Sequence, residues 1–275
     1  MPCADAPGAT IFLPSMKTVL SIAGSDTIGG AGIQADLKTI AAHGLYGMTV
    51  ITALTAQNTR AVQAIHEAPP EFVAQEIDSV FTDIVPDAVK IGMVSSPAII
   101  RVIAEKLRFY GVRRLVVDPV MVATSGSRLL VPEAQAALQQ ELLPLATVIT
   151  PNLPEAMVLA EMDIASPEAM LAAAQKIGAN ISGAVLVKGG HLAQTADDLL
   201  WSDGEAHWYH APRIHTENTH GTGCTLSSAI ACGLAQGGAV PDAVRQAKEY
   251  ITAALQHDPH LGHGNGPLNH VWMLG

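Results

Sequence analysis

The segment HGTGCT at residues 220–225 has residue types and a spacing that suit phosphate binding. Its two glycines let the backbone pass close to a ligand, and the Ala- and Ser-rich segment that follows is expected to be helical. The free N–H groups and the positive dipole at a helix start form an anion site. The segment is not a Walker A loop, because the chain contains no GxxxxGK[ST]. Spacing alone fits an ordinary Gly-rich helix start equally well.

Cys224 is the candidate catalytic base of this segment. It falls in the first helical turn, where the dipole and nearby cations are expected to lower a thiol pKa. A thiolate there can accept the proton of a substrate hydroxyl. The alternative is a small buried hydrophobic residue, the commoner role of a lone cysteine. We assign Cys232, two turns further along the Ala-rich helix, to that second role.

The other informative residues follow segments that resemble buried strands. In open α/β sheets the ligand lies beyond the carboxyl ends of the strands. The residues in these positions are Ser25-Asp26, Gln57-Asn58, Met93, Asp118-Pro119, Asn152 and Lys188-Gly189-Gly190. Their convergence on one edge of the sheet is stronger evidence for a site than any single motif.

The elements that must position these residues alternate along the chain. Apolar strands are expected at 18–23, 48–55, 88–93, 115–118, 147–150 and 184–188. Helices are expected at 29–43, 70–85, 97–110, 132–142, 153–161, 167–177, 221–235 and 240–255. Residues 198–201 and 206–210 flank an Asp-Gly turn and predict a β-hairpin. Strands that are apolar throughout predict an α/β fold with a mainly parallel central sheet and helices on both faces.

Composition narrows the class of protein. An apolar fraction of 49% is ample for one large core, so we expect a single domain over 17–275. The Pro- and Ala-rich residues 1–16 are expected to form a flexible leader. The net charge of -10 disfavours nonspecific nucleic-acid binding. The three cysteines form no CxxC pair, which favours a reducing cytoplasm over a disulfide framework. No apolar run is long enough to predict a signal peptide or a membrane anchor.

Eight ordered segments carry a family resemblance. The chain resembles the hydroxymethylpyrimidine/phosphomethylpyrimidine kinases of thiamin biosynthesis, within the ribokinase-like superfamily. The matching segments are SIAGSD at 21–26, GGAGIQADLKT at 29–39, ITALTAQNT at 51–59, KIGM at 90–93, VVDPVM at 116–121, TPNLPEA at 150–156, VKGGH at 187–191 and NTHGTGCTLSSA at 218–229. The resemblance implies a three-layer ribokinase-like fold. It also implies ATP-dependent phosphorylation of 4-amino-5-hydroxymethyl-2-methylpyrimidine and then of its monophosphate.

The resemblance assigns roles to the phosphate-binding residues. Cys224 matches the family's catalytic base, where other ribokinase-like enzymes carry aspartate. Gly221 and Gly223 would supply amides to the transferring phosphoryl group. The residues that would contact the ATP phosphates are Thr219, Thr222 and Lys188. A lysine that merely extends from a strand end is the alternative for Lys188, and the two glycines beside it weigh against that.

Magnesium is implied by a second group of residues. Asp118 matches the acid that helps to organise Mg²⁺, and Asn152 with Glu155 matches an Asn-x-x-Glu pattern that holds the ion largely through water. The same pair also suits a helix start, with Asn152 as the N-cap and Glu155 three residues on. Both interpretations can hold at once.

Gln57 is the residue that the resemblance assigns to the substrate ring. A carboxamide has one acceptor and two donors, which complement an aminopyrimidine edge. The apolar walls of the pocket would come from Ala31, Met93 and Val120, although the last two also suit the core. Asp36 lies in the first expected helix, and its two interpretations are a residue that reaches the pocket and a solvated helix residue, of which the second is favoured.

Several features leave alternatives open. Thr27-Ile28 stands where the family is usually Ser/Pro-rich, without touching a residue assigned a reactive role. The histidines of the C-terminal segment, His257, His260, His263 and His270, are interpreted as surface residues. The resemblance also implies a homodimer. The alternative functions are a pyridoxine/pyridoxal kinase and a nonenzymatic pyrimidine-binding module. A dinucleotide-binding oxidoreductase is remote, because Gly30-Ala31-Gly32 lacks the third glycine of GxGxxG.

Overall fold

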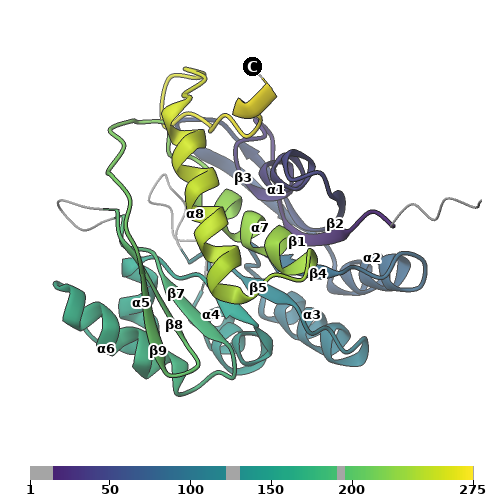
Figure 1. The fold of residues 1–275 in the computed structure, drawn as a ribbon. Coiled ribbons are helices and arrows are strands. Elements are labelled where there is room, and N and C mark those ends of the chain that lie inside the picture. Colours follow the sequence, from purple (N-terminus) through teal and green to yellow (C-terminus); the bar gives the residue numbers. More distant parts are fainter. Residues whose placement is uncertain (1–14, 122–130, 191–195, 275) are drawn as a thin grey trace, which may run out of the picture.

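Apolar strands form a nine-stranded sheet through the middle of the computed structural model, which describes residues 15–121, 131–190 and 196–274. Figure 1 shows the arrangement. The strands are β1 (Thr18–Asp26), β2 (Tyr46–Gln57), β3 (Val62–Glu67), β4 (Ala88–Ile91), β5 (Leu115–Val117), β6 (Val148–Ile149), β7 (Ala184–Val187), β8 (Asp198–Ser202) and β9 (Glu205–Tyr209). Their order in the sheet is β3-β2-β1-β4-β5-β6-β7-β8-β9.

The six central strands are parallel, as predicted. β1 pairs with β2 on one side and with β4 on the other, and the sheet then continues through β5, β6 and β7. The chain therefore reverses its direction of travel across the sheet between β1 and β4. Such a reversal opens a crevice beyond the carboxyl ends of the two strands.

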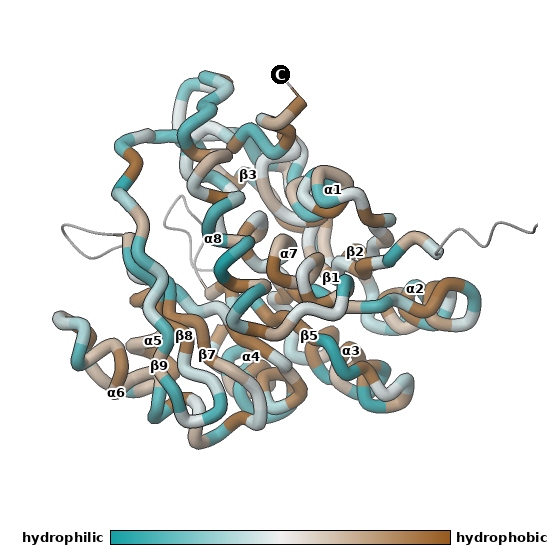
Figure 2. Tube along the Cα trace, viewed as in Figure 1, coloured by the Kyte–Doolittle hydropathy of each residue, from teal (hydrophilic) through white to brown (hydrophobic). Residues whose placement is uncertain are grey.

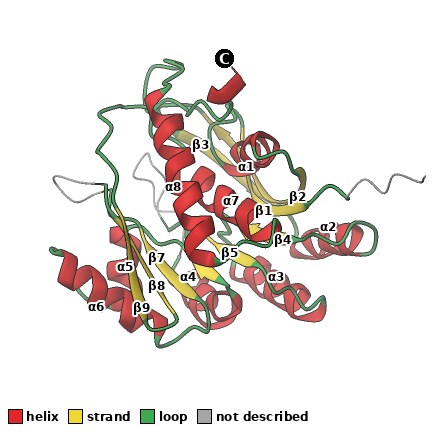
Figure 3. Cartoon of the chain, viewed as in Figure 1, coloured by secondary structure: helices red, strands yellow, loops and turns green. Residues whose placement is uncertain are grey.

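Helices cover both faces of the sheet, so the expected three-layer α/β fold is confirmed (Figure 3). The apolar residues of one face pack against α2 (Pro70–Phe81), α3 (Pro97–Phe109), α4 (Pro132–Ala137), α5 (Leu153–Ala160) and α6 (Pro167–Gly178). Those of the other face pack against α1 (Gly32–Ala42), α7 (Thr222–Ala235) and α8 (Val240–Gln256). In Figure 2 the central strands and α7 are mostly hydrophobic, whereas hydrophobic and hydrophilic residues alternate along α8.

The predicted hairpin is confirmed as β8 and β9, which continue the sheet antiparallel to β7. Strand β3 was not predicted. It pairs antiparallel with β2 at the other edge of the sheet, and five of its six residues are exposed. Because neither of its faces meets the core, its sequence shows no apolar alternation to reveal it.

Several element ends differ from the predictions. Helix α1 begins at Gly32 and not at residue 29, because residues 27–31 form a turn that packs on Asp26. The helix expected over 132–142 divides into α4 and a π-helical turn, Leu138–Leu142. Except for residues 15 and 16, the leader expected over 1–16 lies outside the described residues. Among the described helices, none combines the length and hydropathy that crossing a membrane requires.

Candidate active site

A cavity of about 1130 Å³ lies beyond the carboxyl ends of the central strands and beside the start of α7. Every residue assigned to the site from the sequence lines this one cavity. These residues are Ala31, Gln57, Met93, Asp118, Val120, Asn152, Glu155, Lys188, Thr219, Gly221, Thr222, Gly223 and Cys224. They come from distant parts of the chain, and the reversal between β1 and β4 brings them together.

The start of α7 has the geometry of an anion site. Gly221 is its N-cap, with φ 84°, a conformation that favours glycine. A Cβ on Gly221 would lie 1.8 Å from the carbonyl oxygen of Gly30, so only glycine allows the two turns to meet this closely. The Thr222 hydroxyl donates to the Thr219 carbonyl at 2.7 Å, and no side chain among the described residues caps the first turn of α7. The Thr222 amide donates to the Thr219 carbonyl at 3.2 Å. The amides that follow it at the start of α7 are the ones that face the cavity and suit an anion.

Cys224 faces the same cavity from the first turn of α7. The expected lowering of its thiol pKa is wrong. Desolvation by the surrounding protein raises the pKa, and this outweighs the opposing effect of the Lys90 ammonium and of the backbone N–H of Gly32. The helix start alone therefore does not generate a thiolate, because the surrounding protein disfavours the charged form. Cys232 is fully buried, as predicted.

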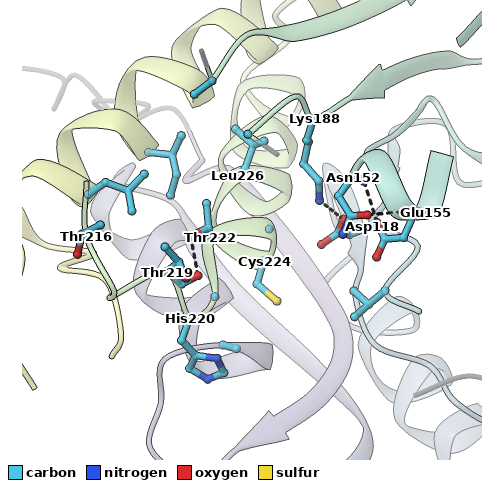
Figure 4. Close-up of a pocket in the computed structure, with 18 of the residues that line it drawn as sticks. Asp118, Asn152, Glu155, Lys188, Thr216, Thr219, His220, Thr222, Cys224 and Leu226 are labelled. Atoms are coloured by element: carbon cyan, nitrogen blue, oxygen red, sulfur yellow. Dashed lines mark hydrogen bonds and ion pairs between the residues drawn. The ribbon is translucent and has the colours of Figure 1, made fainter. Parts of the chain in front are cut away.

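Asp118 and Lys188 form an ion pair at the floor of the cavity. Lys188 Nζ lies 2.8 Å from Asp118 Oδ1, which also accepts a hydrogen bond from the Thr150 hydroxyl at 2.9 Å. Figure 4 shows this pair across the cavity from Thr219 and His220, with Cys224 between the two groups. Burial alone would lower the pKa of the Lys188 ammonium, but the carboxylates of Asp118 and Glu155 raise it. The lysine therefore remains a cation beside the start of α7.

Gly223 allows this pair to approach the phosphate-binding turn. A Cβ at Gly223 would lie 3.0 Å from Asp118 Oδ2 and 3.2 Å from Lys188 Nζ. A larger residue there would have to displace one of the two charged groups. The glycine thus keeps the cation and the carboxylate within reach of a phosphate held by the α7 amides.

Asn152 and Glu155 start α5 with a complete capping box. The Glu155 amide donates to Asn152 Oδ1 at 2.9 Å, and the Asn152 amide donates to Glu155 Oε2 at 2.8 Å. Burial raises the pKa of Glu155 to about 7, and Asp118 adds to this while Lys188 opposes it. The helix-start interpretation is therefore confirmed, and the carboxyl group still lines the cavity.

The donor set fits Mg²⁺ held mainly through water. Asp118, Asn152 and Glu155 present hard oxygen atoms on one side of the cavity, which suit this ion. Nowhere in the described residues do three or more His, Cys, Asp or Glu side chains gather into a closed metal site. An ion bound here would keep several waters and take its remaining ligands from substrate phosphates.

The opposite end of the cavity is organised by Asp26, a residue to which the sequence assigned no role. Its Oδ2 accepts the amides of Gly30 at 2.9 Å and Ala31 at 2.8 Å, and the ring nitrogen Nε2 of His220 lies 2.8 Å away. Gln57 Nε2 lies 3.2 Å from the same ring nitrogen. The positions of Asp26 at the end of β1 and of His220 in the turn were visible signals, but only the fold shows that they meet.

Met93 and Val120 line the cavity beside this polar group. A Cβ on Gly24 would lie 2.6 Å from the Met93 methyl carbon, so the glycine makes room for the thioether at the carboxyl end of β1. The Met93 carbonyl accepts the Thr52 hydroxyl at 2.8 Å, which ties β4 to β2. The cavity thus has an apolar wall next to Gln57, the environment that a flat ring requires.

The interpretation of Asp36 as a solvated helix residue is wrong. Asp36 is fully buried and accepts both contacts of the Lys90 ammonium, at 2.9 and 2.8 Å. The hydroxyls of Ser21 and Ser228 also donate to it, at 2.5 and 2.8 Å. Lys90 projects from the strand beside β1, and the sequence of α1 alone carries no sign of this partner.

The interpretation of the C-terminal histidines holds for His257, His260 and His263, which are exposed, and fails for His270. His270 is 2% exposed, and its Nε2 lies 3.0 Å from the Thr225 hydroxyl of α7. Thr27 also does more than expected, because the backbone N–H of Gln57 donates to its hydroxyl at 3.4 Å. Both contacts join segments far apart in the chain.

One wall of the cavity was missed altogether. It is formed by the segment before α7 and by one face of α8, and its members are Ala211, Pro212, Arg213, Ile214, Thr216, Lys248, Ile251, Thr252 and Leu255. The segment 211–219 has no periodicity that would have placed it against a helix. The apolar face of α8 was visible, but it predicted only packing against the sheet.

Comparisons with known proteins identify the relatives of this chain. A family model described as phosphomethylpyrimidine kinase matches residues 26–269. The hydroxymethylpyrimidine/phosphomethylpyrimidine kinase of Rhizobium meliloti is 54% identical over 255 residues, which cover 91% of this chain and 96% of that protein. The thiamine biosynthesis bifunctional protein ThiED of Geobacter sulfurreducens is 51% identical over 92% of the chain, and the match spans about half of that longer protein, 52%.

The fold of the chain also resembles that of a solved kinase structure. The crystal structure of an ADP complex of Bacillus subtilis pyridoxal kinase matches with a TM-score of 0.87 and 38% identity, over 94% of this chain and 99% of that one. The expected ribokinase-like fold is confirmed by this likeness.

Proposed function

The chain belongs to the phosphomethylpyrimidine kinase family, and on that premise we propose how its cavity performs the reaction. The substrate is 4-amino-5-hydroxymethyl-2-methylpyrimidine, which is phosphorylated by ATP and then phosphorylated again to the diphosphate, in thiamin biosynthesis. Residues 17–275 act as one kinase domain in this proposal. The observation that carries it is the single cavity that holds the phosphate-binding turn, Lys188 and the ring-binding residue Gln57.

The first transfer takes place at the start of α7. The substrate hydroxyl oxygen attacks the γ-phosphorus of ATP, a new O–P bond forms, and the bond to the ADP oxygen breaks. Amides of the turn around Gly221 and Gly223, together with the Lys188 ammonium, stabilise the charge on the phosphoryl oxygens. The hydroxyl proton passes to the thiolate of Cys224, and ADP leaves with its bridging oxygen charged.

The raised pKa of the Cys224 thiol has a consequence for this step. Only the thiolate form can accept the proton, so the first transfer is expected to accelerate as the pH rises above neutrality. A thiolate with a raised pKa is scarcer but more basic. The second transfer differs, because a phosphate monoester is already ionised and needs less help from a base.

Magnesium is proposed to lie beside Asp118, Asn152 and Glu155, whose oxygens line the floor of the cavity. Bound there with ATP, the ion neutralises phosphate charge. The ion pair with Lys188 holds the Asp118 carboxylate in place. Glu155 is expected to lose its proton when a cation binds next to it. Chelation with EDTA is expected to abolish turnover, and added Mg²⁺ is expected to restore it.

A second substrate, pyridoxal, is favoured by one specific observation. The Bacillus subtilis structure that matches over 94% of this chain is a pyridoxal kinase. A chain with this fold can therefore be adapted to a pyridine ring. A nonenzymatic binding module is disfavoured, because Cys224, Asp118 and Lys188 are all present and all line the cavity.

The homodimer remains a proposal, and the β2–β3 ribbon is the surface that supports it. Leu54 is 53% exposed and Ile65 is 42% exposed. The register pairs Leu54 with His66 and Thr55 with Ile65, so the two apolar side chains project from opposite faces of the ribbon. Light scattering coupled to size-exclusion chromatography is expected to give twice the chain mass, and a Leu54→Glu variant is expected to give less dimer. A cytoplasmic location is supported by Cys224 and Cys232, which are both free thiols.

The proposed function is tested by following products rather than ATP loss. The purified chain, ATP and Mg²⁺ are mixed with the pyrimidine alcohol, and the products are separated and weighed by mass spectrometry. The monophosphate is expected first and the diphosphate later. Formation of ADP without either pyrimidine product would contradict the proposal.

A further inference from the structure

The backbone around Lys188 is held at two points directly after β7. The Lys188 amide donates to the Pro151 carbonyl at 2.8 Å, which extends the pairing of β7 with the chain that follows β6. On the other side, the ladder between β7 and β8 ends at Val187. The amide of Gly189 donates instead to a side chain, Asp198 Oδ1, at 2.9 Å. A carboxylate thus takes the place of a backbone acceptor next to the cavity lysine.

Gly189 fits this position because the two segments run very close together. A Cβ on Gly189 would lie 1.8 Å from the carbonyl oxygen of Asp197, so a larger residue would push the chain away from β8. Both Gly189 and Asp198 are buried, and the Asp198 residue is only 3% exposed. A hydrogen bond from an amide to an ionised acceptor is stronger than one between neutral groups. The contact therefore fixes the chain beside Lys188 firmly.

Asp198 has both of its oxygens engaged within the protein. Its Oδ2 lies 2.7 Å from Lys248 Nζ, which projects from α8 and also donates to the Ala196 carbonyl. Burial raises the pKa of Asp198, and the Lys248 ammonium and the Gly189 amide oppose this. Lys248 therefore favours the ionised form of the carboxyl group. Although Asp198 lines the cavity, these contacts suit it to hold the chain and not to bind a ligand.

The position of the Lys188 ammonium depends on this backbone. Figure 4 shows the Lys188 side chain extending toward Asp118, and its Nζ lies 2.8 Å from Asp118 Oδ1. The same Nζ would lie 3.2 Å from a Cβ at Gly223, in the phosphate-binding turn. A displacement of about 1 Å at a reacting centre can slow a reaction by about 100-fold. A shift of the chain at Gly189 would move the cation relative to the transferring phosphoryl group.

We propose that Asp198 is a positioning residue that fixes the backbone beside Lys188 through the Gly189 amide, with Lys248 as its counter-ion. The inference rests on the proposed function and adds a residue on which the placement of its phosphate-binding cation depends. Asp198 does not touch the transferring phosphoryl group. It acts through Lys188, so its effect falls on the transfer step and not on binding of the pyrimidine ring.

The test compares two double variants that both remove the buried ion pair. Asp198→Asn with Lys248→Met keeps an oxygen acceptor for the Gly189 amide, whereas Asp198→Ala with Lys248→Met does not. Neither variant leaves a buried charge without its partner, which would destabilise the fold. The Asn variant is expected to keep most of the kcat. The kcat of the Ala variant is expected to be about tenfold lower, the worth of one hydrogen bond, with little change in KM for the pyrimidine alcohol.

The same two double variants are then compared in the Lys188→Met background, where the residual formation of the monophosphate is followed by mass spectrometry. Their kcat values are expected to be equal, since no ammonium remains to be positioned. A tenfold difference that persists in this background would overturn the inference, because a merely structural role predicts that pattern. Equal kcat values of the two double variants in the chain that retains Lys188 would overturn it too.

The matched control is Arg245→Met, which removes a cation from the same helix. Arg245 pairs with Asp242, both side chains are more than half exposed, and Arg245 does not line the cavity. This variant is expected to preserve both kcat and KM. Absence of turnover of the pyrimidine alcohol by the unmodified chain would instead contradict the proposed function.

Discussion

Two lysine–aspartate pairs lie close to the start of α7, and their settings differ. Lys90 and Asp36 have completely buried side chains, with the ammonium 2.8 Å from the nearer carboxylate oxygen. Lys188 and Asp118 are held at the same distance, but their side chains are 15% and 3% exposed and line the cavity. The N···O distances alone would not distinguish a structural ion pair from a functional one.

The partners of each aspartate show the difference. Asp36 accepts from Lys90 and from the hydroxyls of Ser21 and Ser228, so both of its oxygens are engaged within the protein. The hydrogen bonds to Asp118 from the Thr150 hydroxyl and Lys188 both go to Oδ1, and its Oδ2 lies beside Gly223. A saturated buried pair fixes elements relative to one another. Within the described residues Asp118 Oδ2 accepts no hydrogen bond, so a pair placed like this at a cavity can exchange partners with a ligand.

The largest effect is expected from breaking the buried pair. Asp36→Asn leaves the Lys90 ammonium buried without its counter-ion, and the free energy of unfolding is expected to fall by about 3–5 kcal/mol. Urea denaturation followed by circular dichroism measures this. The double variant Asp36→Leu with Lys90→Met removes both charges and is expected to be more stable than Asp36→Asn. If Asp36→Asn unfolds at the same urea concentration as the unmodified chain, the pair is not structural.

The Asp118–Lys188 pair is expected to matter more for activity than for stability. Lys188→Met should lower kcat/KM by about 100- to 1000-fold, because a fixed cation beside the transferring phosphoryl group is lost. Its unfolding midpoint in urea should change much less than that of Asp36→Asn. Steady-state kinetics and denaturation on the same preparation measure both effects. Comparable losses of stability in the two variants would erase the distinction between the pairs.

Cys224 lines the same cavity as the Asp118–Lys188 pair, and its substitution is expected to affect the two phosphorylation steps differently. Cys224→Ala is expected to slow phosphorylation of the alcohol by about 100-fold, the usual worth of a positioned base, and phosphorylation of the monophosphate by less. In the unmodified chain the rate with the alcohol should rise with pH above neutrality, since the thiol pKa is raised, and the variant should lose this rise. Separate steady-state assays with each substrate measure the effect. Equal slowing of both steps would exclude Cys224 as a base specific to the first.

The smallest effect concerns His270, another buried polar contact of α7. Burial, with Lys38 and His220 adding to it, lowers its pKa from 6.5 to about 4. The unfolded chain therefore takes up a proton first as the pH falls, and stability is expected to decline from about pH 6.5 to about pH 4, by up to about 3 kcal/mol. Denaturation midpoints across this range measure the decline.

The control for this prediction is His260→Gln, since the His260 side chain is 85% exposed. His270→Gln is expected to flatten the decline, whereas His260→Gln should keep it. A decline of equal slope in both variants would assign the pH dependence to other groups.

Much of the fold and site was predictable because the signals were local. Apolar strands, the Asp-Gly hairpin and the glycine turn at 220–225 are each visible within a short window of sequence. The buried position of Asp36 and the exposed strand β3 were not. The first depends on a lysine far along the chain, and the second on backbone pairing that leaves no apolar pattern. His270 was missed for the same reason as Asp36, because its partner Thr225 lies on another element.

The most direct test of the central claim is a coupled ADP-release assay with the pyrimidine alcohol, its monophosphate and pyridoxal in parallel. Turnover of both pyrimidines in an ATP-dependent reaction is expected, with a higher kcat/KM for the alcohol than for pyridoxal. Lys188→Met is expected to lose this turnover while remaining folded. A higher kcat/KM for pyridoxal than for either pyrimidine would contradict the proposed function.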